Sequence, residues 1–135
     1  MKILIDTNIV LDLLLEREPF IDSATSLFEA IEQGKLHGYI TATTITNIFY
    51  IIRKAKDRET AITSIQSLLV GLQFCSVDRS VVTTALDLGL KDFEDGIQLA
   101  CATLDQLDAI VTRDLKDFSS ANLPIWTVAD LLARL

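Results

Sequence analysis

The sequence predicts an α/β fold with three layers (α/β/α), in which helices cover both faces of a central, mainly parallel sheet. Short apolar runs that are typical of buried strands alternate along the chain with longer segments of helical periodicity. Strands separated by helices need right-handed crossover connections, and these connections make the strands parallel. The 135 residues fit a single domain over residues 1–135, and 50% of them are hydrophobic, which is enough for a continuous core.

The first half of the chain predicts strands and helices with recognisable boundary residues. Lys2–Ile5 is an apolar strand, and the polar segment that starts at Asp6 opens a helix that ends by Glu18 and Pro19. The pattern then predicts a helix over about 20–33 stopped by Gly34, a strand over 38–40, a helix capped by Thr43 or Thr44 that runs to Lys56, and a helix capped by Asp57 that ends near Gly71.

The second half of the chain repeats this alternation. The pattern predicts a strand over 73–77, a helix from Asp78 through Leu88, a helix from Asp92 to about Leu107, strands over 109–112 and 125–127, and a terminal helix. In open parallel sheets, ligands bind beyond the carboxyl ends of the strands, at the point where the strand order reverses. Polar residues that directly follow a strand are therefore the first candidates for a functional site.

The charge balance restricts the kinds of nucleic-acid binding that fit this chain. The net charge is −7 and the sequence pI is about 4.5. Affinity for nucleic acid usually depends on Lys and Arg side chains that neutralise phosphates, so an acidic chain is a poor RNA binder by itself. Bound divalent cations reverse the field inside an acidic pocket, and a basic partner protein can supply positive surface. The charge therefore opposes a free-standing RNA binder more than it opposes a metal-dependent nuclease.

Cysteine placement and hydropathy indicate the compartment. Cys75 and Cys101 lie in apolar runs without CxxC spacing, which favours reduced core thiols in a cytosolic protein. The chain opens with a strand-like segment and not with a signal peptide. Two long uncharged stretches, over 36–52 and 60–77, are interrupted by polar residues and are too polar to span a bilayer. We therefore expect a soluble, cytoplasmic protein with no membrane segment.

Three aspartates follow or precede strands at positions that suit a metal site. Asp6 lies at the carboxyl end of the first strand, Asp114 lies just after the strand over 109–112, and Asp95 lies in the first turn of the helix before that strand. If the first and fourth strands are neighbours, the three carboxylates converge over one crevice. Clustered carboxylates repel one another, and a divalent cation such as Mg²⁺ relieves that repulsion. Such a site can activate water for phosphodiester cleavage.

Each acidic residue also has an ordinary structural interpretation, which the sequence leaves open. Asp6 is a favoured residue for capping the first helix, and Asp114 can cap a short turn over 115–118. Asp92 with Asp95 three residues later resembles a capping box, and Glu94 fits a solvated carboxylate in a first helical turn. The combination at strand ends, and not any single acid, favours a metal site.

Four segments in order resemble a PIN domain over essentially the whole chain. They are Asp6-Thr7-Asn8 after the first strand, Thr41 to Thr46 opening the middle helix, Asp92-Phe93-Glu94-Asp95-Gly96 opening a late helix, and Ile110 to Asp114 near the end. The chain looks most like the small single-domain PIN proteins to which the VapC toxins of toxin–antitoxin pairs belong. The resemblance implies a Mg²⁺- or Mn²⁺-dependent endoribonuclease that hydrolyses RNA phosphodiesters with water, leaving a 3′-hydroxyl and a 5′-phosphate. It also implies an antitoxin partner and allows a homodimer.

The resemblance assigns roles to individual residues. Asp6, Asp95 and Asp114 would bind the metal, and Thr112 would be the strand-end hydroxyl that supports the site or contacts phosphate. Asn47 stands where the family usually places a glutamate in the middle helix, so it belongs to the catalytic set in place of a charged ligand. This departure keeps an alternative open, a catalytically weakened PIN-like module that binds RNA or protein. Asp117 is interpreted as a surface charge or a peripheral acid.

Other features have two interpretations each. Arg17 and Arg113 flank the expected crevice and either contact phosphate or pair with an aspartate. The basic cluster Arg53, Lys54, Lys56 and Arg58 is either a solvated helix end or an RNA contact. Tyr50 and Trp126 are expected at the edge of the core. A receiver-like signalling domain is also α/β with an acidic pocket, but it expects paired acids after the first strand, where this chain has Asp6 followed by Thr7.

Overall fold

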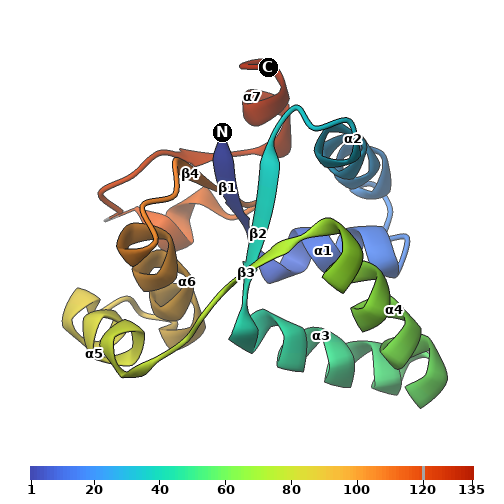
Figure 1. The fold of residues 1–135 in the computed structure, drawn as a ribbon, viewed down its shortest axis with the longest axis horizontal. Coiled ribbons are helices and arrows are strands. Elements are labelled where there is room, and N and C mark those ends of the chain that lie inside the picture. The colour runs from blue at the N-terminus through green and yellow to red at the C-terminus, as the bar shows by residue number, and fades with distance from the viewer. Residues whose placement is uncertain (120) are drawn as a thin grey trace.

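A computed structural model of the chain describes residues 1–119 and 121–135. These residues form a five-stranded sheet in the order β3-β2-β1-β4-β5 (Figure 1). Every pairing in the sheet is parallel. The predicted three-layer α/β class with a parallel sheet is therefore confirmed. The strands are β1 (Lys2–Ile5), β2 (His37–Thr41), β3 (Gln73–Cys75), β4 (Ala109–Val111) and β5 (Ile125–Trp126).

The strand order reverses on the two sides of β1. The chain first builds outward through β2 and β3, and then returns to place β4 and β5 on the other side of β1. Ile5 pairs with Val111, so β1 and β4 end at the same level of the sheet. The expectation that the first and fourth strands are neighbours is confirmed. Their carboxyl ends form the switch point at which open parallel sheets bind ligands.

The helices follow the predicted order, with ends that differ by a few residues. The first helix ends at Leu14 and thus before Glu18 and Pro19, as predicted, because Glu16 adopts a left-handed φ of 51° and the Arg17 N–H donates to the carbonyl of Asp12 at 3.0 Å. The helices are α1 (Thr7–Leu14), α2 (Ile21–Glu32), α3 (Ala42–Ala55), α4 (Arg58–Gly71), α5 (Arg79–Leu88), α6 (Phe93–Leu104) and α7 (Val128–Leu132), with a 3₁₀ turn η1 (Leu115–Phe118).

Two apolar cores lie on opposite faces of the sheet. Successive side chains of a strand point to opposite faces, so Ile3 and Ile5 enter one core while Leu4 enters the other. The core that contains Ile3 and Ile5 is covered by α1, α2, α3, α4 and α7, and the core that contains Leu4 is covered by α5 and α6. Figure 1 shows α5 and α6 on one side of the strands and α1 to α4 on the other. The last three side chains of β1, those of Ile3, Leu4 and Ile5, are fully buried, which fixes the position of the residue that follows them.

Helix capping agrees with the sequence at most positions. Asp57 accepts the Thr60 N–H and caps α4, as predicted, and Asp78, predicted as the start of α5, accepts the Val81 N–H in the same way. The prediction that Thr43 or Thr44 caps α3 is wrong, because Thr41 is the cap and accepts the Thr44 N–H at 3.2 Å. The strand β2 extends to Thr41 itself, so the chain passes from strand to helix without an intervening turn.

Predictions about single residues are confirmed in part. Cys75 and Cys101 are free and buried, and burial raises the pKa of the Cys101 thiol to about 12. Trp126 is partly buried and packs under the Arg134 guanidinium, 4.3 Å from the ring centroid, as expected at a core edge. Tyr50 is instead 59% exposed and meets the Phe49 ring edge-on, with the ring centroids 5.4 Å apart, so its placement at the core edge is wrong. Across the described ranges, no helix has the length and hydropathy needed to cross a membrane.

Candidate active site

Asp6 holds the position directly after β1, at the switch point of the sheet. Its backbone N–H continues the ladder by donating to the Val111 carbonyl at 3.0 Å, and the residue is only 6% exposed. Asp6 occupies the N-cap position of α1, but its side chain makes no capping hydrogen bond there. Its carboxylate accepts the Thr112 hydroxyl at 2.7 Å and the Gln98 side-chain amide at 3.1 Å. The capping interpretation of Asp6 is therefore wrong, and the carboxylate faces β4 and α6.

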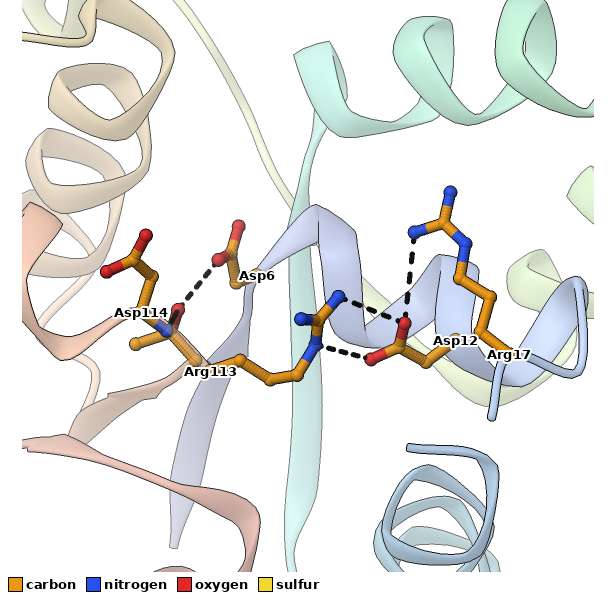
Figure 2. Close-up of polar contacts among 6 residues, drawn as sticks. Asp6, Asp12, Arg17, Arg113 and Asp114 are labelled. Atoms are coloured by element: carbon orange, nitrogen blue, oxygen red, sulfur yellow. Dashed lines mark hydrogen bonds and ion pairs between the residues drawn. The ribbon is translucent and has the colours of Figure 1, made fainter. Parts of the chain in front are cut away.

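Thr112 connects Asp6 to Asp114. Its fully buried hydroxyl donates to Asp6 Oδ2 and accepts the backbone N–H of Asp114 at 3.0 Å. In Figure 2 the side chains of Asp6 and Asp114 both extend toward the top of the view. The Asp114 side chain precedes η1 without capping it, so its capping interpretation is wrong as well. One hydroxyl group thus fixes the relative placement of two acidic residues that are far apart in sequence.

Asp95 lies in the first turn of α6 in an electrostatically unfavourable place. Asp92 caps this helix and accepts the Asp95 N–H at 3.2 Å, as predicted. Partial burial is the largest cause that raises the pKa of Asp95 to about 7, followed by the negative charges of Asp92, Asp6, Asp117 and Glu94. The ionised form of Asp95 is therefore destabilised by neighbours of like charge.

Asp117 belongs to the same acidic group, although its residue is exposed. Its pKa is raised by partial desolvation and then by the hydrogen bond and the charge of Asp114, with smaller contributions from Asp6 and Asp92. The interpretation of Asp117 as a peripheral acid thus fits its surroundings. Over residues 1–119 and 121–135, however, no three acidic, histidine or cysteine side chains converge closely enough to form a ready-made metal cluster. Asp92, Asp95 and Asp117 line one cavity between the start of α6 and η1, whereas Asp6 and Asp114 are not among its lining residues.

A chain of hydroxyl groups links α1, α3 and α6 beside Asp6. The Thr7 hydroxyl donates to Glu94 Oε1 at 3.0 Å and pairs with the Thr44 hydroxyl at 2.9 Å. Thr44 in turn pairs with Thr41 at 3.0 Å, and Thr41 pairs with Thr43 at 2.8 Å. Glu94 is half-buried through this contact, so the interpretation of Glu94 as a solvated carboxylate is wrong. The cluster of threonines at the start of α3 was the sequence feature that could have indicated this network.

Asn47 lies on α3, three residues after Thr44 and therefore on the same side of the helix. Its side chain is half-buried. The Thr43 hydroxyl, four residues before Asn47 on α3, pairs with the Thr41 hydroxyl at 2.8 Å. Asn47 is thus placed on the α3 face that carries the hydroxyl network next to Asp6, and its role as a ligand stays a prediction.

Gln98 is a site residue that sequence reasoning missed. It is 1% exposed, lies one turn after Asp95 on α6, and donates to Asp6 Oδ1. Its own carbonyl oxygen, Oε1, is buried and has no hydrogen-bond partner among the described residues. Burial of such an amide inside the core is uncommon unless it contacts another polar group, which here is Asp6. The sequence feature that could have indicated it is one amide inside the apolar run Ile97 to Ala102.

Asp12 is the second missed residue, and it pairs with both candidate arginines. Its carboxylate, in a residue only 1% exposed, accepts Arg113 Nε at 2.8 Å and Arg113 Nη2 at 3.2 Å, while Arg17 Nη1 lies 3.8 Å away. The Arg113 guanidinium also stacks on Phe20, 3.8 Å from the ring centroid. Figure 2 shows Arg113 and Arg17 approaching Asp12 from two sides. Of the two interpretations, pairing with an aspartate is confirmed for both arginines.

The basic cluster at the end of α3 is solvent-exposed. Arg53 and Lys54 occupy the last turn of α3, where cations interact favourably with the helix dipole. Lys56 and Arg58 follow on either side of the Asp57 cap. The placement agrees with a solvated helix end, and contact with RNA stays a prediction.

Comparison with known proteins agrees with this architecture. The PIN domain family model matches residues 2–116. No curated protein sequence matches the chain. Among solved structures, the VapBC2 complex of Rickettsia felis bound to a promoter DNA fragment is 17% identical, with 93% of this chain and 97% of that chain covered and a TM-score of 0.74.

Two further solved structures share the fold. The Mycobacterium tuberculosis toxin VapC20, described as cleaving the sarcin-ricin loop, is 14% identical over 90% of this chain and 95% of its own, with a TM-score of 0.73. A toxin–antitoxin complex from Klebsiella pneumoniae is 24% identical over 93% of this chain and 96% of its own, with a TM-score of 0.68. With a family match that begins at the first strand and extends beyond Asp114, this chain belongs to the PIN-domain family.

Proposed function

We propose that this protein is a metal-dependent endoribonuclease that hydrolyses RNA phosphodiesters and acts as the toxin component of a toxin–antitoxin pair. The observation that carries the proposal is the orientation of Asp6. Its carboxylate does not cap the helix it precedes, and hydrogen bonds from Thr112 and Gln98 hold it at the switch point beside Asp114. Membership of the PIN-domain family and the fold shared with an RNA-cleaving toxin support the same activity.

The residues at this site fit a divalent cation by their chemistry. Carboxylate oxygens are the ligands that Mg²⁺ prefers, and Mn²⁺ accepts the same donors. The raised pKa of Asp95 reflects burial and neighbouring negative charges, which a cation between the carboxylates would offset. Asp6, Asp95 and Asp114 would hold Mg²⁺ or Mn²⁺. When bound, the ion supplies an activated water and balances the charge that develops during phosphodiester hydrolysis.

The protein groups around these carboxylates have supporting roles in this proposal. Thr112 orients Asp6 Oδ2 and Gln98 orients Oδ1, so the carboxylate has one defined direction. The raised pKa leaves Asp95 incompletely ionised near neutral pH, and a bound cation would favour its ionised form. Asn47 offers a neutral amide oxygen in place of a carboxylate. The site therefore carries one negative charge fewer than it would with glutamate at this position.

The toxin role rests on the fold and on charge. The similar structures include complexes of a toxin with its antitoxin. The net charge of −7 makes this chain a natural target for a basic protein segment. We propose that an antitoxin fills the crevice and presents an Arg or Lys to the carboxylates, and that the active protein forms a homodimer.

Asn47 favours a second candidate, a PIN-like module that binds RNA or protein with little catalysis. The loss of one charged ligand weakens the hold on a divalent cation and slows any step that depends on it. The two candidates differ in one outcome. The binding module retains RNA affinity in the presence of Mn²⁺ without cleaving the RNA, whereas the ribonuclease cleaves it.

Site-directed variants test the proposed function. Calorimetric titration with Mn²⁺, together with cleavage of a fluorescent RNA, compares the wild type with Asp6→Asn and Asp95→Asn. Asp22→Asn is the matched control, because Asp22 is exposed in the first turn of α2 and its carboxylate makes none of the contacts described for the site. We expect both site variants to lose most of the Mn²⁺ affinity and the activity, and the control to retain both. Wild-type binding by the two site variants would show that the metal binds elsewhere.

A further inference from the structure

We propose that Asp12 and Arg113 are positioning residues of the candidate active site. Their ion pair fixes the connection between β4 and η1 (residues 112–114) against α1, and thereby sets the placement of Thr112 and Asp114 relative to Asp6. The effect on metal binding rests on the proposed function, whereas the effect on the connection itself does not.

The first step of the argument is the burial of Asp12. The residue is 1% exposed and lies in the second turn of α1, with Leu11 buried and Leu13 partly buried beside it. An ionised carboxylate in such surroundings is very costly unless it is paired and hydrogen-bonded. Arg113 meets this requirement with two donors, at 2.8 and 3.2 Å. The pairing is therefore enforced by the surroundings of Asp12 and is not an incidental surface contact.

The geometry of the pair restricts orientation as well as distance. Two donors of a planar guanidinium bind both carboxylate oxygens, which removes rotation about the contact. The Phe20 ring covers the face of the same guanidinium at 3.8 Å from its centroid. The edge of the Arg113 guanidinium is thus bound by Asp12 of α1, and its face is covered by Phe20. These two contacts leave the side chain little freedom to move.

Arg113 lies between Thr112, which contacts Asp6 directly, and Asp114, which is linked to Asp6 through the Thr112 hydroxyl. Thr112 donates to Asp6, and the Asp114 N–H donates to Thr112. The strand β4 ends at Val111. Within the connection at 112–114, the one backbone bond to a neighbouring strand is that of the Thr112 N–H, which donates to the Trp126 carbonyl at 2.9 Å. Figure 2 shows Arg113 extending toward Asp12 while Asp114 points to the opposite side. Anchoring Arg113 therefore determines the side on which Asp114 is presented.

One helix carries both anchor points. Asp6 precedes α1 and Asp12 lies within it, so the spacing between them is that of a rigid helical segment. The connection touches this helix at its start through Thr112 and near its middle through Arg113. Two contacts of one short connection with one helix leave little freedom for Asp114. This is the arrangement expected of a support that holds metal-binding side chains in place.

An effect of this ion pair on stability can be separated from an effect on the positions of Thr112 and Asp114. Replacing a buried ion pair by apolar side chains of similar size is often neutral or stabilising. The double variant Asp12→Leu/Arg113→Met removes both charges together and leaves neither unpaired. It should fold, yet its connection at 112–114 is no longer tied to α1. Arg17→Met is the matched control, because Arg17 also faces Asp12, at 3.8 Å, but lies outside the connection.

Two readouts on the full-length protein test the proposal. In Mn²⁺ titration, the double variant should bind about 10- to 100-fold more weakly than the wild type, the usual effect of removing outer support from a metal site, while Arg17→Met should bind like the wild type. In hydrogen exchange of the metal-free protein, the Asp114 amide should lose protection in the double variant. The amides of β1 should keep their protection in all three proteins.

The outcomes separate this proposal from the proposed function. A folded double variant with wild-type Mn²⁺ affinity and wild-type protection of the Asp114 amide would overturn the positioning role. If the wild type binds no Mn²⁺, the proposed function fails, and exchange at Asp114 still decides the positioning role. If the double variant does not fold, Arg113→Lys replaces it with the same readouts, since Lys keeps the charge but lacks the two-donor fork. Unchanged exchange in that variant would also count against the proposal.

Discussion

The Thr112 hydroxyl donates to Asp6 Oδ2 at 2.7 Å and accepts the Asp114 N–H at 3.0 Å, so one oxygen atom joins the ends of two neighbouring strands. The two partners in the first contact are 106 residues apart in sequence. The contact is fully buried on the Thr112 side, where water cannot replace either bond. A single substitution of Thr112 should therefore disturb the placement of both Asp6 and Asp114.

Replacing Thr112 should lower both stability and metal affinity. Thr112→Val keeps the shape of the side chain but leaves the Asp6 oxygen and the Asp114 N–H without this partner, which should cost about 1–3 kcal/mol of unfolding free energy. Thr112→Ser keeps the hydroxyl and should retain most of the affinity for Mn²⁺. Urea unfolding and Mn²⁺ titration measure the two effects. Equal behaviour of the Val and Ser variants would show that the hydroxyl does not orient Asp6.

The raised pKa of Asp95 predicts a pH dependence of metal-free stability. The folded-state pKa is about 7 and the ordinary value is 3.8, so the unfolded state loses this proton first as pH rises. The contribution of Asp95 is therefore fully present below the ordinary pKa and is lost as pH rises through the folded-state pKa. Thermal unfolding between these two pKa values should show a falling Tm for the wild type and a flatter profile for Asp95→Asn. A profile shared by both proteins would remove Asp95 as the cause.

Substitution of Asn47 tests whether it replaces a charged ligand. Asn47→Glu should raise Mg²⁺ affinity and RNA cleavage, because it adds one negative charge to a site that binds a cation. The same charge should lower the Tm of the metal-free protein through repulsion with the nearby carboxylates. Asn47→Gln controls for the longer side chain. If the wild type is fully active and Asn47→Glu changes neither affinity nor rate, Asn47 is not a substituted ligand.

The antitoxin partner predicts a specific outcome in cells. Expression of this protein alone should inhibit growth, and co-expression with the product of the adjacent reading frame should relieve the inhibition. The two proteins should also be recovered together by pull-down. Recovery of this protein alone, with no growth inhibition when it is expressed, would contradict the toxin role. An Asp6→Asn variant that still inhibits growth would separate toxicity from the candidate active site.

The sequence predicted the frame of the site because that frame depends on local patterns. Apolar runs separated by helical segments required a parallel sheet, and the acids Asp6 and Asp114 were recognisable as residues that directly follow strands. Asp57 and Asp92 were predicted as caps for the same reason, since capping involves residues three apart. Thr41 was missed as the cap of α3 because several neighbouring threonines offered equivalent hydroxyls and the extent of β2 decided between them.

The supporting residues could not be predicted because their partners are distant in sequence. Asp12 pairs with Arg113 across 101 residues, and Gln98 contacts Asp6 across 92 residues. Asp12 is the single charged residue in the apolar run Ile9 to Leu15, which could have indicated its burial, but nothing in the sequence identifies Arg113 as its partner. Its burial depends on how α1, α2 and the connection at 112–114 pack together. Glu94 was misjudged for the same reason, because its contact with Thr7 depends on the packing of α6 against α1.

The most direct measurement of the central claim is the position of a bound metal in the crystallised protein. Anomalous diffraction from crystals grown with Mn²⁺ locates the ion without relying on activity. We predict a manganese peak at the carboxyl ends of β1 and β4, within ligand distance of Asp6 and Asp114, which Asp6→Asn abolishes. A peak elsewhere in the molecule, or one that survives Asp6→Asn unchanged, would contradict the account.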